Sequence, residues 1–201
     1  MKKVLALAAV AALTSAAAAD SVTQVVDIAW DGGLTGEVAT ASISLPALAS
    51  IDSISIDLAH TWGGDFLITL TGDTNGSVFE LMNDETVDAG GFQSGNFEMG
   101  IADNDGSLAN VAPYEFVAPG SGIDMTAILR DDLLGGFSGI DANSWTSGAL
   151  AADTYTLSVT DLFAGDPGAV GSITVNYTIP APGAIALLGL AGLAGGRRRR
   201  A

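Results

Sequence analysis

The chain has 201 residues, with 23 Asp and Glu against 7 Lys and Arg, one His and no Cys. This length fits one domain, or two at most. The segment 20–180 holds every acidic residue and a single basic one, so it carries 1 − 23 = −22. A body this acidic repels phosphate backbones, which excludes nucleic acid as a partner. The absence of cysteine excludes disulfides and thiolate metal sites.

The first nineteen residues have the pattern of a secretory signal peptide. Lys2 and Lys3 precede an apolar stretch over residues 4–13, and small residues follow up to Ala19. The apolar stretch is too short to span a bilayer of roughly 30 Å, which argues against a permanent N-terminal anchor. We therefore predict a signal peptide over residues 1–19, cleavage between Ala19 and Asp20, and an exported domain over residues 20–180.

The C-terminal residues combine a proline motif, an apolar segment and a basic cluster. Pro180, Ala181 and Pro182 should end the preceding strand, because proline cannot donate to a β-ladder. The uncharged segment 183–196 would rise about 21 Å as a helix, which is short for a full membrane span. The basic residues after it would stay on the cytoplasmic side of the membrane. This cluster consists of Arg197, Arg198, Arg199 and Arg200.

This three-part order over residues 181–201, directly after Pro180, resembles the PEP-CTERM sorting signal of Gram-negative bacteria. The segment departs from that family at Ala181, where glutamate is usual. The resemblance implies handling by an exosortase-type membrane protease and transient anchoring in the inner membrane. Release to the cell surface or extracellular matrix would follow. A buried helix with a disordered basic tail is the alternative interpretation of the same residues.

Alternation of apolar and polar residues with a period of two dominates the segment 20–180. The apolar positions of three such stretches are Ile54, Ile56 and Leu58; Tyr155, Leu157 and Val159; and Ile173, Val175, Tyr177 and Ile179. Each stretch predicts a strand with one face buried. Gly- and Asp-rich turn signals separate the strands, and no helical period is sustained. We therefore predict one all-β domain, an antiparallel β-sandwich or jelly roll.

A series of short motifs over about residues 51–179 resembles the P domain of proprotein convertases. The residues that carry this resemblance are His60 and Thr61, then Asp65, the segment 134–139, Trp145, the strand 155–161 and the turn 165–168. The chain departs from the family by an extra glycine before Asp65 and by the lack of a proline in 72–76. The resemblance implies a jelly roll of the kind that follows and stabilises a subtilisin-type protease, and that carries no catalytic residues itself.

The single histidine offers little for catalysis. His60 has the same parity as the apolar residues before it, so it should continue the buried face of that strand. A catalytic triad needs a nucleophile within reach of an oriented base, and no nucleophile-elbow motif occurs in the sequence. Pairs of carboxylates arise by chance in a chain this acidic and therefore indicate no glycosidase. Trp30, Trp62 and Trp145 could line a sugar platform or serve as packing residues.

Calcium is the cofactor that the composition favours, since hard cations take oxygen ligands. Asp103 and Asp105 lie in one acidic loop, and Asp161 and Asp166 flank another. The first loop does not fit an EF-hand, whose first and twelfth positions would fall on Ile101 and Ala112. A discontinuous Ca²⁺ site joining the two loops at one end of the sandwich is the hypothesis. Solvated acidic loops without a metal are the alternative.

The sequence therefore predicts a secreted, surface-sorted, non-enzymatic structural or adhesive β-sandwich. Contact with exopolysaccharide would be bridged by Ca²⁺, because an acidic surface repels an acidic polymer unless a divalent cation lies between them. The alternative function is a P-domain-type accessory module that docks on a separately encoded subtilisin-like protease.

Overall fold

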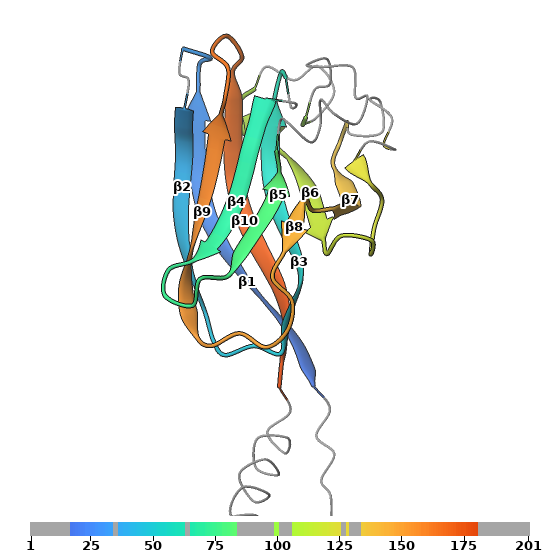
Figure 1. Cartoon of the computed structure of the whole chain (residues 1–201). Helices are drawn as coiled ribbons and strands as arrows, with labels where there is room; N and C mark the ends of the chain where they lie inside the picture. Colours follow the sequence, from blue (N-terminus) through green and yellow to red (C-terminus); the bar gives the residue numbers. More distant parts are fainter. Residues whose placement is uncertain are drawn as a thin grey trace, which may run out of the picture.

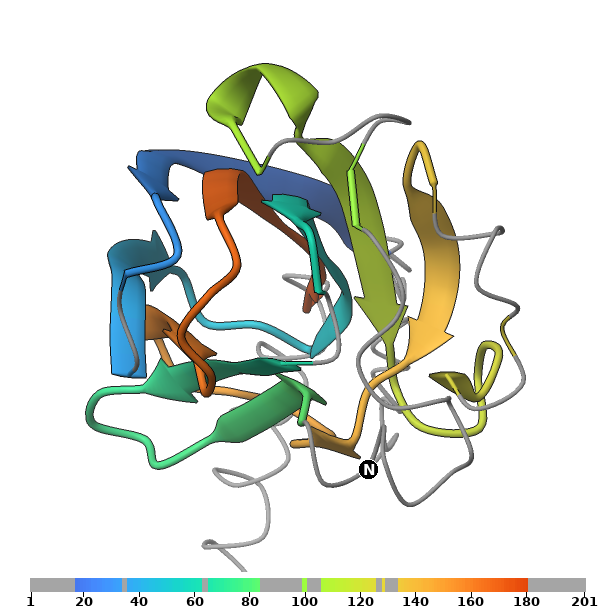
Figure 2. The same ribbon diagram turned by 90° about the horizontal axis from the view of Figure 1, so that it is seen from above.

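The computed structural model describes residues 17–33, 36–62, 65–83, 99–100, 106–125, 128 and 134–180, without the side chains of residues 37 and 38. These residues form two five-stranded sheets that pack face to face (Figures 1 and 2). The first sheet has the order β1 (Ala18–Trp30), β10 (Gly168–Ile179), β3 (Ser50–His60), β6 (Ala112–Val117), β7 (Phe137–Asp141). The second has the order β2 (Gly36–Leu45), β9 (Asp153–Asp161), β4 (Phe66–Gly72), β5 (Val78–Met82), β8 (Ser144–Trp145). The short 3₁₀ helix η2 spans Leu108–Asn110.

The all-β sandwich that the sequence predicts is confirmed. The chain passes repeatedly from one sheet to the other, for example from β1 to β2, from β2 to β3 and from β9 to β10. The strand pairs of the two sheets are antiparallel except for β6 and β7, which run parallel. The connection between them covers residues 118–136, which is long enough for the crossover that a parallel pair requires.

The hydrophobic core lies between the two sheets and consists of the inward residues of both. The predicted alternation matches it: nine of the ten predicted apolar positions are buried, and Ile179 at the end of β10 is half-buried. Large side chains that are fully buried include Phe66, Phe79, Tyr114, Phe116 and Tyr155. Because successive side chains of a strand point to opposite faces, the hydroxyl-bearing residues between these positions lie on the outer faces of the sheets.

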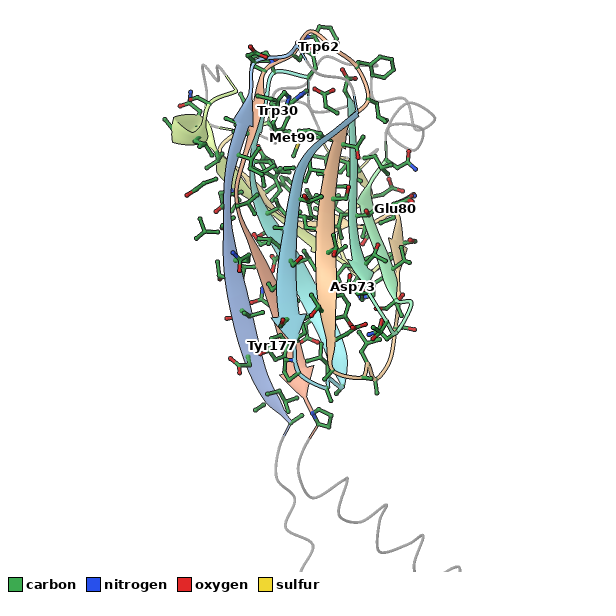
Figure 3. All side chains as sticks on the ribbon, turned by 90° about the vertical axis from the view of Figure 1, so that its left-hand side faces the viewer. Trp30, Trp62, Asp73, Glu80, Met99 and Tyr177 are labelled. Carbon is green, nitrogen blue, oxygen red and sulfur yellow. The ribbon has the colours of Figure 1, made fainter. Side chains whose placement is uncertain are left out.

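The sandwich has two ends that differ in what they carry. At the terminal end, where Ala18 pairs with Ile179, β1 begins and β10 ends side by side (Figure 1, bottom). At the loop end lie the turn over residues 31–33, the residues 61–62 and the turn over residues 162–167. Figure 3 shows Trp62 and Trp30 at this end and Tyr177 at the other. The order of strands therefore separates the two chain ends of the domain from the buried residues His60 and Asp161.

Candidate functional site

A buried polar cluster closes the core at the loop end. His60, the last residue of β3, and Asp161, the last residue of β9, are both fully buried. The His60 Nε2 lies 3.5 Å from the Asp161 Oδ2. The indole Nε1 of Trp30 donates to the same carboxylate oxygen at 3.1 Å, and the backbone N–H of Phe163 donates to the other oxygen at 3.1 Å. Phe66 packs against the imidazole with ring centroids 4.4 Å apart.

The surroundings of His60 determine which of its nitrogens carries a proton. The backbone N–H of Trp62 donates to Nδ1 at 3.0 Å, so Nδ1 must be the unprotonated nitrogen. In the neutral ring the proton is then on Nε2, which faces Asp161. Burial lowers the pKa of His60 below its ordinary value, and the nearby Asp161 carboxylate opposes only part of that shift. We therefore assign a neutral imidazole at neutral pH.

Backbone and side-chain hydrogen bonds join the turns around this cluster. The Thr61 hydroxyl donates to Asp166 Oδ1 at 3.0 Å, and the N–H of Leu162 donates to the carbonyl of Asp65 at 2.9 Å. The N–H of Gly165 donates to the carbonyl of Gly32 at 2.7 Å. These bonds connect residues that are far apart in sequence, so the loop end is held together across both sheets.

Close packing at the loop end depends on glycine. A Cβ added to Gly168, the first residue of β10, would lie 2.2 Å from the Trp30 ring and 2.5 Å from the His60 ring. A Cβ on Gly106 would lie 2.3 Å from the carbonyl oxygen of Pro167. The segment that follows residue 105 therefore packs directly against the 162–167 turn. This contact places Gly106 at the loop end of the sandwich.

The geometry of the His60 cluster does not suit general base catalysis. A catalytic histidine must present one ring nitrogen to a nucleophile, and here Nδ1 accepts from a backbone N–H while Nε2 faces Asp161. Neither side chain is accessible to solvent, so no substrate can reach it in this conformation. What the cluster can do is fix the positions of the turns. The Trp30–Asp161 bond joins the ends of β1 and β9, and the bonds from Trp62 and Phe163 hold the turns that follow His60 and Asp161.

The predicted calcium residues have different positions. Asp103 and Asp105 lie outside the described residues. Asp161 is buried with both carboxylate oxygens accepting hydrogen bonds, whereas Asp166 is half-buried and accepts from Thr61. Within the described ranges, no three His, Cys, Asp or Glu side chains gather in a way that could hold a metal ion. The two-loop Ca²⁺ site therefore stays a prediction that depends on the loop before Gly106.

Other predicted residues lie elsewhere. Trp145, on β8, is half-buried and packs edge-on against Phe79 with ring centroids 4.9 Å apart. At the terminal end, Ala19 pairs with Thr178 and Asp20 pairs with Tyr177. Pro180 is the last described residue. Ala181, Pro182 and the four arginines at 197–200 lie outside the described residues, which contain no helix long and apolar enough to cross a membrane.

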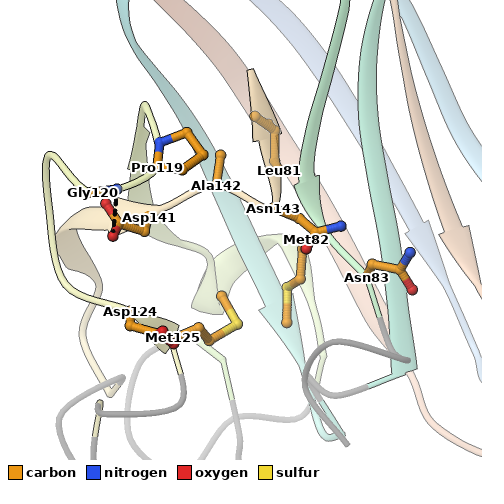
Figure 4. A pocket seen from close by; sticks show the side chains of 10 residues that line it. All are labelled: Leu81, Met82, Asn83, Pro119, Gly120, Asp124, Met125, Asp141, Ala142 and Asn143. Carbon is orange, nitrogen blue, oxygen red and sulfur yellow. Dashed lines mark hydrogen bonds between the residues drawn. The ribbon is translucent and has the colours of Figure 1, made fainter. Parts of the chain in front are cut away.

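A pocket on the side of the sandwich was not anticipated from the sequence. Its volume is about 400 Å³, and its apolar wall includes Leu81 from β5 and the thioethers of Met82 and Met125 (Figure 4). Asp124 and Asp141 supply its acidic groups. The Asp141 carboxylate accepts from the N–H groups of Gly120 and Gly122, which fixes the 119–122 turn along one side of the pocket. A volume of this size falls within the range of small-molecule sites.

The residues that sequence reasoning missed are those whose role depends on a distant partner. Trp30 precedes Asp161 by more than a hundred positions, and nothing in its local pattern indicates that its indole N–H meets that carboxylate. Asp141 ends a strand that the alternation signal does not mark. For Trp30, the only signal in the sequence is a tryptophan at the end of a strand, just before the glycine turn at residues 31–33.

No protein-family model matches this chain, and neither does any curated protein. Among solved structures, the crystal structure of a serine protease of Aeromonas sobria is similar over 80% of this chain, with a TM-score of 0.37 and 12% sequence identity. The similar region is 27% of that chain, so the present chain spans only part of its length. No residue role is transferred from that protease to this chain.

Proposed function

We propose that the protein is a non-enzymatic β-sandwich displayed at the cell surface, where its loop end makes adhesive or structural contacts. The observation that carries the proposal is the position of the chain ends. The start of β1 and the end of β10 are paired neighbours, so the predicted signal peptide and sorting segment both join the domain at its terminal end. A domain held by that end presents its loop end away from the membrane.

The loop end has the surface that such a role needs. Trp62 and Phe163 are 38% and 53% exposed there, beside a network that holds the turns in place. Exposed aromatic side chains on a rigid support are common in contact surfaces. The state of His60, the only histidine of the chain, supports the non-enzymatic part of the proposal.

Processing at the predicted site would leave the sandwich largely intact. Cleavage after Ala19 removes two residues of β1, Ala18 and Ala19, and leaves the pairing from Asp20 onward. Intact-mass analysis of the protein from culture supernatant and from membranes tests this proposal. We expect a secreted species that lacks residues 1–19 and the C-terminal segment. Uncut protein confined to the cytoplasm would contradict surface display.

A matched pair of variants isolates the basic cluster. Replacing all four residues Arg197, Arg198, Arg199 and Arg200 by alanine should prevent processing of the C-terminus and keep the protein out of the supernatant. Replacing the same four by lysine keeps the charge and should preserve more of the release. Equal release of both variants would mean that the cluster does not act through its charge.

The calcium part of the proposal has its own test. Ca²⁺ that binds only the folded state should raise the melting temperature of the secreted protein. It should also increase co-sedimentation with an acidic polysaccharide. Both effects should be lost in Asp103→Asn and Asp105→Asn and kept in Asp20→Asn at the terminal end. If Ca²⁺ changes neither the melting temperature nor the co-sedimentation of the secreted wild-type protein, the calcium part of the proposal is wrong. Surface display is not affected by that result.

One observation favours the alternative function as an accessory module of a subtilisin-like protease. The motif residues Thr61 and Asp166 are about a hundred positions apart, yet the Thr61 hydroxyl donates to the Asp166 carboxylate. The carbonyl of the motif residue Asp65 likewise accepts from Leu162, which directly follows the motif strand 155–161. Recovery of such a protease with the secreted protein, under conditions that keep both native, would support this alternative. The fold by itself does not decide between the two functions.

A further inference from the structure

The two sheets have four edge strands, and three of them carry devices that prevent edge-to-edge pairing. β8 has only two residues. β7 has five, and its outer side is covered by Ile123, which bonds Gly139 and Asp141. β1 is long, but a register shift between Val25 and Ile28 interrupts it, and Asp27 there has a φ of 50°. Short strands, bulges and charged residues are the usual means of blocking an edge.

The fourth edge, β2, has none of these devices between Ala39 and Leu45. This seven-residue segment pairs with β9 in continuous register and contains no charged residue and no proline. Its outward residues Thr40, Ser42 and Ser44 are exposed. Among the described strands, β9 is its only ladder neighbour, so half of its backbone N–H and C=O groups face outward along the edge. A long, regular, uncharged edge of this kind is a template for another strand.

The charge distribution favours a second copy of the same chain at this edge. Two bodies of charge −22 repel each other over most of their surfaces. The outward residues of the neighbouring strand β9 opposite this segment, Thr154, Thr156 and Ser158, are neutral as well. The β2 edge is therefore a place where two copies can approach without bringing carboxylates together.

We propose that β2 pairs antiparallel with β2 of a second copy, with the two-fold axis at Ser42. In this register Ser42 faces Ser42, Thr40 faces Ser44, and Ala39 faces Leu45. Outward residues then meet outward residues, as the two-residue period of strands requires. Each outward pair joins two hydroxyl groups, a cross-strand pair that stabilises sheets. The sheet that contains β2 in one copy would then continue into the same sheet of the second copy.

The size of the contact predicts a weak, concentration-dependent dimer. A single seven-residue ladder is well below the interface of about 1,200 Å² or more that stable complexes bury. Association should therefore be favoured where copies are crowded, as on a surface. Long-range repulsion between the acidic bodies also opposes it. Because a Debye length is about 10 Å at 0.1 M salt and about 3 Å at 1 M, raising the salt concentration should increase the dimer fraction.

The cysteine-free chain allows a direct test by disulfide cross-linking of the full chain in mild detergent. In an antiparallel pair, directly opposed Cα atoms are about 4.5–5.5 Å apart, within the range that a disulfide spans. Ser42→Cys should therefore form covalent dimers under mild oxidation about tenfold faster than either control, because pairing raises the local thiol concentration. The controls are Thr156→Cys on the adjacent inner strand and Thr23→Cys on the interrupted edge β1.

The register provides a second, independent readout. Thr40→Cys and Ser44→Cys should each cross-link poorly alone, since identical positions would be four residues apart along the strands. A mixture of the two variants should form heterodimers readily. Equal cross-linking by Ser42→Cys and both controls would overturn the proposal, as would self-cross-linking of Thr40→Cys as fast as its cross-linking with Ser44→Cys. Either result would indicate random collision, parallel pairing or association through other segments.

Discussion

Strand β9 begins with Asp153 at the terminal end and finishes with Asp161 at the loop end, and these two aspartates differ in their environment. Asp153 is partly exposed and accepts from the N–H groups of Thr74 and Asn75 at 2.9 and 2.8 Å. Asp161 is fully buried and accepts from Trp30 and from the backbone of Phe163. Asp153 thus holds a turn that is distant in sequence, whereas Asp161 joins the end of β1 to the turn that follows Asp161 itself.

The comparison shows how burial changes the value of the same hydrogen bonds. If Asp153 is removed, water can satisfy the donors of the 73–76 turn. If Asp161 is removed, the Trp30 indole N–H stays in the core without an acceptor of comparable strength. We therefore expect a substitution of Asp161 at the loop end to destabilise the whole domain. A substitution of Asp153 at the terminal end should affect only the local turn.

Replacing Asp161 by alanine should give the largest effect. Asp161→Ala leaves the buried Trp30 Nε1 without its acceptor, and a buried unsatisfied donor costs about 1–3 kcal/mol. We expect a loss of roughly 3 kcal/mol in the free energy of unfolding, measured by urea titration. Asp153→Ala is the matched control at the other end of β9. An equal loss in the two variants would contradict the distinction between the two ends.

Adding one methyl group at the start of β10 should rank second. In Gly168→Ala the new Cβ would overlap the rings of Trp30 and His60, both of which are fixed by hydrogen bonds. Overpacking of this kind costs about 1–3 kcal/mol, and we expect about 2 kcal/mol. Gly171→Ala on the same strand is the control. Its Cβ would come no closer than 3.1 Å to another atom, the Val111 side chain, so its overlap is smaller than that of Gly168→Ala. A drop in melting temperature no larger than that of the control would show that the rings can move.

The sequence predicted the strand interiors because alternation reports which face of a strand is buried. The same parity placed His60 inward, and the structure confirms that it is buried. Alternation cannot report which strand ends lie close together. It therefore could not predict that His60, at the end of β3, lies beside Asp161, at the end of β9. For the same reason it could not predict that the Asp161 carboxylate accepts from the Trp30 indole N–H.

The pocket and the parallel pair were beyond the sequence for a related physical reason. Pro119 lies in the connection after β6, whereas Met82 ends β5 and Asp141 ends β7, and these three residues meet at one cavity only in the folded chain. Such an arrangement depends on local backbone conformations, among them the positive φ values of Gly120 in the connection and of Gly139 within β7, which leave no periodic signal in the residues around them.

The pH dependence of stability should distinguish His60 from the acidic residues. The pKa of His60 is lower in the folded chain than its ordinary value of 6.5, so the unfolded chain binds the proton more readily. Its contribution to stability is present above about pH 6.5 and is lost as the pH falls through the folded pKa. Urea titrations between about pH 7 and pH 5 should show that the free energy of unfolding of the wild type decreases as the pH is lowered.

His60→Asn removes this titration while keeping a side-chain acceptor for the Trp62 N–H. The variant is less stable at every pH because it loses the ring contact with Phe66. What matters is its slope, which should be flatter than that of the wild type over the same pH range. Since the chain has one histidine, parallel slopes in the two proteins would contradict the assignment of a neutral buried imidazole.

The smallest effect should come from Asp153, and it should lie in a different pH range. Partial desolvation raises the pKa of this carboxyl, but hydrogen bonds from Asn75, Thr74 and Thr154 together outweigh that effect and lower the pKa below 3.8. Its contribution is therefore present above the unfolded pKa and is lost as the pH falls through the folded one. Asp153→Asn should flatten the stability slope below about pH 4 and leave the slope near pH 6 unchanged. If Asp153→Asn instead altered the slope near pH 6, the two ends of β9 would be coupled, and their separation into a local and a global region would fail.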